Sequence, residues 1–298
     1  MNTMKKLFLC VFCTIAINAT AQDSMISNIH DIEPIGNHYK ALQRLSPEKR
    51  VDFSSMDTIA YPTDKYLDFL LVYALNQPKY LTEGQVNFLS RSVAFPANSS
   101  EQTRAELDFL LDLQNKRTES GNARVLQLAG IGYWPHKNYT KTHRGYSENE
   151  SELFFMAEEV MGKNKLTVNY PKTLELLKGV MNDTRHIEFA IKFDLLRARP
   201  YHLDTNIKPL REIPTPSFPS GHTLWAYIQA FTLSELIPEK RDEFIGLAYE
   251  IGLSREIMGV HFPSDEETAR QITHRMLTLM WHTEKFQNDF NAAKEEWN

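Results

Sequence analysis

Helical periodicity is the feature that most constrains what this chain can fold into. From Glu152 onward, apolar residues recur at three- and four-residue spacing, and Pro, Gly and Asn interrupt the pattern at intervals. Few runs alternate apolar and polar residues between turn signals, so a sheet has little support. We therefore predict an all-α fold with helices over 152–162, 171–183, 184–197, 220–236, 239–260 and 265–282.

Composition excludes several classes of protein. The 298 residues are 42% hydrophobic and 24% charged, which is ordinary for one large globular domain or two small ones. A net charge of −5 argues against a nucleic-acid binder, because such proteins gain most of their affinity from basic surface. A mean hydropathy of −0.41 argues against a polytopic membrane protein, and no stretch after residue 21 reaches the ~20 apolar residues of a spanning helix.

The first 21 residues have the three parts of a secretory signal peptide. Lys5-Lys6 precedes an apolar run over 7–17, and Ala19-Thr20-Ala21 provides small residues for cleavage. We expect cleavage after this segment and a periplasmic or secreted protein; a non-cleaved anchor is the alternative. Both cysteines, Cys10 and Cys13, would be removed, and loss of the two lysines would move the net charge from −5 to −7.

The first informative segment is Lys192-x6-Arg199-Pro200. Residues seven apart lie two turns along one helix face, and we expect Pro200 to end that helix immediately after Arg199. Two cations directed at one point suit a phosphoryl group, with Arg199 as a planar fork and Lys192 as a point charge. Taken alone, such a pair is usually a solvated surface.

The second segment is Pro219-Ser220-Gly221-His222, which precedes an apolar run. Ser220 is expected to cap a helix, and Gly221 leaves the backbone accessible, so the first N–H groups could face an anion. His222 would lie in the first turn, where it could protonate a departing oxygen. The structural alternative is a capped helix with an incidental histidine.

The third segment is Ser254-Arg255-x5-His261-x3-Asp265. Phe262-Pro263 should break the helix after His261, and Ser264 should cap the next one with Asp265 in its first turn. A carboxylate that accepts from one imidazole nitrogen fixes the tautomer and leaves the other nitrogen free to attack. A histidine near an aspartate is more often structural, but the three segments together specify eleven residue types in order.

These segments resemble the three signature motifs of the type 2 phosphatidic acid phosphatase (PAP2) superfamily, with all eleven positions matched. The similarity is greatest to the bacterial class A non-specific acid phosphatases and runs from about Leu81 to the C-terminus. It implies a single-domain helical bundle of the PAP2/vanadium haloperoxidase type over 85–298, following the signal peptide 1–21 and a helical extension 22–84 that has no counterpart.

The resemblance also implies roles for individual residues. His261 would be the nucleophile that forms a phosphohistidine, oriented by Asp265, and His222 would be the general acid. The phosphoryl oxygens would be held by Lys192, Arg199, Ser220, Gly221 and Arg255. These donors would take the place of a metal, so we expect no metal or other cofactor, with vanadate as an inhibitor. The expected partners are small phosphorylated substrates, together with a possible second copy in a homodimer.

The chain also departs from the class A pattern. Pro216-Ser217-Phe218 stands where Gly-Ser-Tyr is usual, Phe262 replaces a usual Trp, and Glu266-Glu267 follow Asp265 where small residues are common. These changes remove no predicted catalytic group but leave substrate preference open. The leading interpretation is a metal-independent phosphomonoesterase. A lipid or prenyl-pyrophosphate phosphatase, a vanadium-dependent haloperoxidase and a non-enzymatic binding protein are the alternatives.

Overall fold

The prediction of an all-α fold is confirmed. The computed structural model describes residues 37–65, 70–75, 77–134, 146–162 and 169–297; the expected signal segment lies outside these ranges. Across them there is no strand, and an isolated antiparallel bridge joins Ala60 to Arg197. The α-helices are α1 (Asn37–Leu42), α2 (Leu71–Ala74), α3 (Glu83–Arg91), α4 (Glu101–Asn115), α5 (Glu119–Gly130), α6 (Tyr146–Leu153), α7 (Phe155–Met161), α9 (Pro171–Leu195), α10 (Pro200–Leu203), α11 (Gly221–Leu236), α12 (Arg241–Ile257), α13 (Pro263–Met280) and α14 (Glu284–Lys294).

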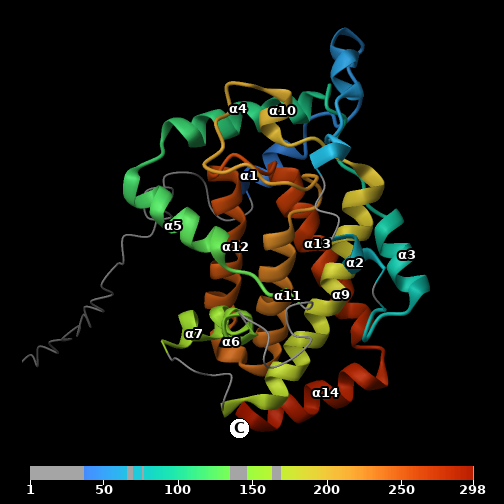
Figure 1. Cartoon of the computed structure of the whole chain (residues 1–298), viewed down its shortest axis with the longest axis vertical. Helices are drawn as coiled ribbons and strands as arrows, with labels where there is room; N and C mark the ends of the chain where they lie inside the picture. The colour runs from blue at the N-terminus through green and yellow to red at the C-terminus, as the bar shows by residue number, and fades with distance from the viewer. Residues whose placement is uncertain (1–36, 66–69, 76, 135–145, 163–168, 298) are drawn as a thin grey trace, which may run out of the picture.

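Helix α11 forms the centre of the fold. Thirteen of its sixteen residues are buried, including Leu224, Trp225 and Leu233, so it is apolar around nearly its whole circumference. A helix of this kind is stable only when other helices surround it. Figure 1 shows α11 enclosed by α9, α12 and α13, and these helices make its most extensive contacts.

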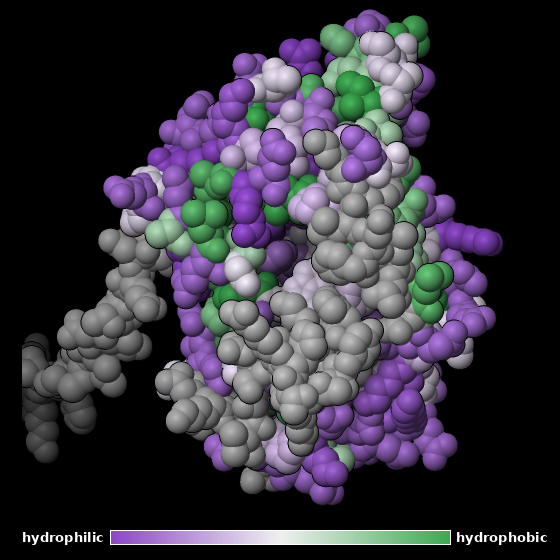
Figure 2. Space-filling model, in the orientation of Figure 1, coloured by the Kyte–Doolittle hydropathy of each residue, from purple (hydrophilic) through white to green (hydrophobic). Residues whose placement is uncertain are grey.

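The remaining helices complete the core and the surface. Helix α14 crosses one end of the bundle and packs against α9, while α4 and α5 cover the other side near α12 (Figure 1). A second apolar cluster joins α4 and α5 to the end of α12 through Leu110, Val125 and Ile257. Figure 2 shows that the visible face is largely hydrophilic, with apolar side chains in small separate areas.

Two helix boundaries differ from the sequence prediction. The predicted helices 171–183 and 184–197 are one continuous helix, α9. Asn182 and Asp183 do not interrupt it, because the Asp183 side chain accepts from backbone N–H groups of another segment. The predicted helix 152–162 is instead split between α6 and α7 at Phe154, which has non-helical φ and ψ of −92° and 1° and is fully buried in the core.

The first motif also folds differently from the prediction. Helix α9 ends at Leu195, and Leu196 adopts the left-handed conformation with φ of 51°. Arg199 therefore lies beyond the helix, in extended backbone, and Pro200 begins α10 instead of ending α9. Proline is well suited to the first position of a helix because that position needs no N–H donor. The left-handed turn, and not helical spacing, brings Arg199 close to Lys192.

The described part of the predicted N-terminal extension is helical, with α1, α2 and two short 3₁₀ helices, Val51–Thr58 and Thr63–Lys65. It packs directly on the first motif. The backbone N–H of Tyr61 donates to the Leu196 carbonyl at 2.8 Å, beside the Ala60–Arg197 bridge. The Tyr61 hydroxyl donates to the Ile213 carbonyl at 3.2 Å. The extension thus braces the segment that carries Arg197 and Arg199.

Asp183 joins the chain before α3 to the middle of α9. Its carboxylate accepts hydrogen bonds from the backbone N–H groups of Tyr80 at 2.8 Å and Leu81 at 2.9 Å, and from that of Lys79. A buried backbone donor without a partner is costly, so one side chain satisfies three groups that the turn leaves unpaired.

We predict that Asp183→Ala lowers the free energy of unfolding by about 3 kcal/mol, because it leaves buried N–H groups without an acceptor. Urea denaturation followed by circular dichroism measures this change. Asp194→Ala, an exposed aspartate on the same helix, is the matched control and should change stability by less than about 0.5 kcal/mol. Equal effects of the two substitutions would contradict the assigned role of Asp183.

Candidate functional site

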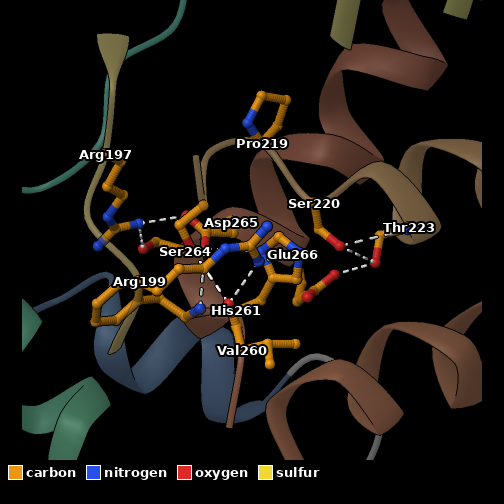
Figure 3. Close-up of polar contacts among 12 residues, drawn as sticks. Arg197, Arg199, Pro219, Ser220, Thr223, Val260, His261, Ser264, Asp265 and Glu266 are labelled. Carbon is orange, nitrogen blue, oxygen red and sulfur yellow. Dashed lines mark hydrogen bonds and ion pairs between the residues drawn. The ribbon is translucent and has the colours of Figure 1, made fainter. Parts of the chain in front are cut away.

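The three motifs meet at one cavity of about 400 Å³. It lies at the N-terminal end of α11, where the C-terminal ends of α9 and α12 approach. Six of the eight predicted site residues line it: Lys192, Arg199, Gly221, His222, Arg255 and His261. The other two, Ser220 and Asp265, lie directly behind this lining and are fully buried. Figure 3 shows His261, Arg199 and Asp265 directed toward one another.

The start of α11 is built as the sequence predicts. The Ser220 hydroxyl accepts from the Thr223 backbone N–H at 3.5 Å, so the predicted N-cap is confirmed. The requirement for glycine at 221 has a specific cause. A Cβ at this position would overlap Oε1 of Glu188, which is pressed against the first turn of α11. Only a glycine leaves room for both the carboxylate and the helix terminus.

His261 is held between an acid and a cation. Its Nδ1 lies 3.1 Å from Asp265 Oδ2, and its Nε2 lies 2.9 Å from Arg199 Nη1 (Figure 3). An arginine can only donate and a carboxylate can only accept, so Nδ1 carries the proton and Nε2 presents its lone pair. Burial lowers the pKa of His261 well below its usual value, and the charge of Arg199 adds to this effect. Its imidazole is therefore neutral.

Asp265 accepts hydrogen bonds from several directions. Burial by itself would raise its pKa, but Arg197 at 2.6 Å, His261 and the Ser217 hydroxyl at 2.6 Å together lower it below the usual range. The carboxylate also accepts from the Phe262 backbone N–H at 3.0 Å. This last contact corrects the predicted cap: α13 begins at Pro263, and Asp265, not Ser264, closes its first turn.

The three predicted cations are buried but differ in what satisfies them. Lys192 Nζ donates to the carbonyls of Pro216, Ser217 and Pro219 at 2.7, 3.2 and 2.7 Å. Burial, together with the charge of Arg199, lowers the pKa of Lys192 to about 7. In this arrangement Lys192 holds the loop that leads into α11.

Arg199 is anchored mainly by backbone carbonyls. Its Nη1 donates to the Val260 carbonyl at 2.7 Å, and its Nε donates to the Thr215 carbonyl at 2.9 Å. Arg255 has the weakest partners, because its Nη1 reaches only the Met258 sulfur at 3.3 Å and its buried Nε has none. Burial lowers the pKa of Arg255 to about 9. An anion in the cavity would supply the acceptors that Arg255 lacks.

His222 lines the same cavity. The ring hydrogen-bonds to the Ala129 backbone, and its buried Nε2 has no partner among the residues that the structure describes. Burial lowers the pKa of His222 well below its usual value, and Arg255 and Arg185 lower it further. Burial and these two cations therefore disfavour the protonated ring, and an anion bound nearby would favour it.

Sequence reasoning missed Arg197, which supports the histidine–aspartate pair. Its Nη1 donates to Asp265 Oδ1 and to the Ser264 hydroxyl at 2.8 Å, and its Nη2 lies 3.4 Å from Glu106 Oε2. Its guanidinium lies over the ring of Phe262, 3.9 Å from the centroid. The sequence signal for Arg197 was its position two residues before Arg199, with Ala198 between them. Glu106 is distant in sequence from the motifs, so no local pattern connected it to the site. Burial raises the pKa of Glu106 to about 7.

The two glutamates that follow Asp265 have separate environments. Glu266 is buried beneath the first turn of α11 and accepts from the Thr223 hydroxyl (Figure 3). Burial raises the pKa of Glu266 well above its usual value, and nearby Glu256 raises it further. Glu267 instead pairs with Arg270 at 2.6 Å near the surface. Neither side chain enters the cavity.

Two further properties of the described residues bear on the alternatives. Within the described ranges, no three His, Cys, Asp or Glu side chains are grouped as a metal site would need. Over the same ranges, none of the helices combines the length and apolarity needed to cross a membrane.

Part of this chain is similar to known proteins. A non-specific acid phosphatase of Providencia stuartii is 37% identical over 133 residues, which are 43% of this chain and 54% of that protein. A non-specific acid phosphatase of Salmonella typhimurium is 29% identical over 157 residues, covering 51% and 62% of the two chains. The matched stretch thus spans little more than half the length of these relatives.

A transmembrane PAP2-type phosphatidylglycerolphosphate phosphatase from Bacillus subtilis is a similar solved structure. It covers 72% of this chain and 93% of its own at a TM-score of 0.43 and 18% identity. Residues 180–289 match the family model of the PAP2 superfamily, and they contain all eleven motif positions. This match confirms the resemblance to that superfamily that the motifs indicated.

Proposed function

We propose that this protein is a phosphatase that hydrolyses phosphate monoesters through a phosphohistidine intermediate on His261. The observation that carries the proposal is the state of that residue. Its neutral imidazole keeps the proton on Nδ1, and its unprotonated Nε2 accepts from Arg199 in a cavity that Arg255 and His222 also line. A nucleophile, an orienting acid, cations and a proton donor are the parts that phosphoryl transfer requires.

In the first step, His261 Nε2 attacks phosphorus and the bond from phosphorus to the ester oxygen breaks. His222 gives its proton to the departing oxygen as the alcohol leaves. In the second step, a water oxygen attacks the phosphohistidine, His222 takes the water proton, and the P–N bond breaks to release phosphate. Asp265 keeps the proton on Nδ1 throughout and stabilises the charge that develops on the ring.

The cations would neutralise the transferring group. Arg255 Nε has no acceptor among the described residues, so Arg255 is the first candidate to hold a phosphoryl oxygen. Arg199 already contacts Nε2, the attacking atom, and would hold an oxygen close to it. The backbone N–H at Gly221 adds the dipole of α11. Lys192 and Ser220 have other partners here, so direct contact of either with a phosphoryl oxygen stays a prediction.

A purified sample tests the proposal by hydrolysis of p-nitrophenyl phosphate with and without EDTA and vanadate. We expect activity that survives EDTA, because protein cations would supply the charge otherwise provided by a metal. Vanadate should inhibit, because it would imitate the transferring group in the same cavity. Loss of activity in EDTA that returns with a divalent metal would contradict the metal-independent mechanism.

We predict that His261→Ala lowers kcat by about 10³-fold or more, since it removes the attacking atom. The measurement is initial rates on p-nitrophenyl phosphate. His282→Ala, at an exposed position on the loop after α13, is the matched control and should retain full activity. Full activity of His261→Ala would reject the histidine mechanism.

We predict a pH dependence that follows from the lowered pKa of His222 in the empty site. The quantity kcat/KM reports the free enzyme, so it will fall as pH rises through that low pKa. A bound anion raises the pKa of His222, so kcat will fall only at a higher pH. Coincident descending limbs for kcat and kcat/KM would contradict this prediction.

The effect of removing the general acid on the rate should depend on the leaving group. We predict that His222→Asn slows glycerol 2-phosphate by about 10²- to 10⁴-fold. The same variant should slow p-nitrophenyl phosphate much less, because nitrophenolate departs without a proton. Initial rates on both esters check this, and an equal loss on the two substrates would contradict the assignment of His222.

A lipid or prenyl phosphate is a second candidate substrate because apolar side chains also line the cavity. They are Leu70, Trp134, Phe189 and Ile213. Such side chains would favour an apolar leaving group. Relative kcat/KM on short-chain phosphatidate and on glycerol 2-phosphate distinguishes the two candidates.

The proposed place of action is the periplasm or the medium, and its support is the residue pattern of positions 1–21. Expression of the full-length gene in a Gram-negative host tests it. We expect the processed protein to begin at Gln22, as measured by intact mass. Recovery of unprocessed chain in the membrane fraction would favour the alternative of a non-cleaved anchor.

A further inference from the structure

A carboxylate lies inside the cavity that the cations form. Glu188 is the acid among the described residues that line it, and its side chain is 5% exposed. Its Oε2 accepts from Arg185 Nη1 at 2.6 Å. Its Oε1 lies against Gly221 at the N-terminal end of α11, where the helix dipole attracts an anion. A negative group therefore lies beside the place proposed for the phosphoryl group.

The position of Glu188 is fixed by Arg185. The Arg185 Nε donates to the Tyr133 carbonyl at 3.2 Å, and its guanidinium lies 4.2 Å from the centre of the Trp134 ring. The Arg185 guanidinium thus balances the charge of Glu188, but it donates to only one of the two carboxylate oxygens, Oε2. Within the described part of the chain, the hydrogen bond from Arg185 is the one that Glu188 accepts, so Oε1 faces the cavity as a free acceptor.

The charged and titratable groups around Glu188 come from every neighbouring element. They are Arg185 and Lys192 on α9, Arg199 before α10, Arg211 between α10 and α11, His222 on α11, Arg255 on α12 and His261 before α13. Burial lowers the pKa of both Lys192 and Arg199, and the negative charge of Glu188 offsets part of this lowering. Asp265, the other nearby acid, is already engaged by Arg197, His261 and Ser217. Glu188 is therefore the acid left to meet a bound anion.

A free carboxylate oxygen discriminates between protonation states of an anion. A phosphoryl dianion presents only acceptors, so an oxygen placed against Oε1 would be repelled with no donor between them. A monoanion carries one P–OH group, which can donate a short, charge-assisted hydrogen bond to the carboxylate. Phosphate monoesters exchange between these forms near a pKa of about 6. The pocket can therefore distinguish the two forms through one oxygen atom.

We propose that Glu188 makes this site selective for the protonated, monoanionic phosphoryl group, whose P–OH donates to Oε1. The inference rests on the proposed function for the identity of the anion and adds its protonation state. It has a consequence for a related anion. Sulfate matches phosphate in shape but has no proton near neutral pH, so the same oxygen should reject it.

Direct binding tests the proposal. Calorimetric titrations of the purified protein with methylphosphonate and with sodium sulfate, between pH 5 and pH 8, give both dissociation constants. Methylphosphonate carries one P–OH group as a monoanion and none as a dianion, and it has no ester bond to hydrolyse. We expect sulfate to bind about 100-fold more weakly than methylphosphonate at pH 5, as expected for an unpaired buried acceptor. Sulfate does not titrate in this range, so its affinity follows the charges of the protein alone. The sulfate-to-methylphosphonate ratio of dissociation constants therefore isolates the proton of the anion, and it should fall as pH rises.

Glu188→Gln is the diagnostic variant, because the amide still accepts from Arg185 and can also donate to an unprotonated oxygen. We expect the ratio to fall to within about threefold of unity and to lose its pH dependence. Glu250→Gln, which alters the ion pair with Arg124 away from the cavity, is the matched control and should keep the wild-type ratio. A folded Glu188→Gln protein with an unchanged ratio would overturn the proposal.

The wild-type protein alone also decides the matter if Glu188→Gln does not fold. Sulfate binding as tight as that of methylphosphonate at pH 5, a ratio that rises with pH, or binding of neither anion would each overturn the selectivity. Hydrolysis of p-nitrophenyl phosphate is read separately. Selective binding without hydrolysis rejects the proposed function only, and hydrolysis without selectivity rejects the role of Glu188 only.

Discussion

The burial of the Asp265 carboxylate is the constraint on which the rest of the site depends. A buried carboxylate is tolerated only where donors surround it, and here four donors come from three separate segments: Arg197, Ser217, and His261 with the Phe262 backbone. Satisfying this one group fixes the end of the first motif, the loop before α11 and the start of α13 together. The orientation of the His261 ring follows from that arrangement.

The buried cations of the cavity differ in how their positive charge is compensated. Lys192 and Arg199 are compensated largely by backbone carbonyls, which supply acceptors without adding a negative charge to the cavity. Arg255 and His222 keep buried nitrogens without partners. A buried nitrogen without a partner lowers the stability of the protein. A bound anion would accept a hydrogen bond from that nitrogen, so the free energy recovered in this way would contribute to anion affinity. The net charge of −5 therefore describes the surface and not this cavity.

The predicted N-terminal extension is part of this arrangement. Its Ala60 and Tyr61 pair with the backbone at Arg197 and Leu196, and its Leu70 lines the cavity itself. Leu70 and the Glu188–Arg185 pair lie outside the three motifs and line the same cavity as the motif residues.

Local sequence determined much of this protein by itself. Apolar periodicity identified α11 and α12, Ser220 marked the start of α11, and motif order indicated which side chains act together, because each of these depends on near neighbours in the chain. Only the tertiary structure decided that Leu196 turns Arg199 toward His261 and that Arg197 holds Asp265. It also placed Glu188 against Gly221, although they lie on different helices. Such contacts join residues distant in sequence, and their energies arise from burial, which no local pattern records.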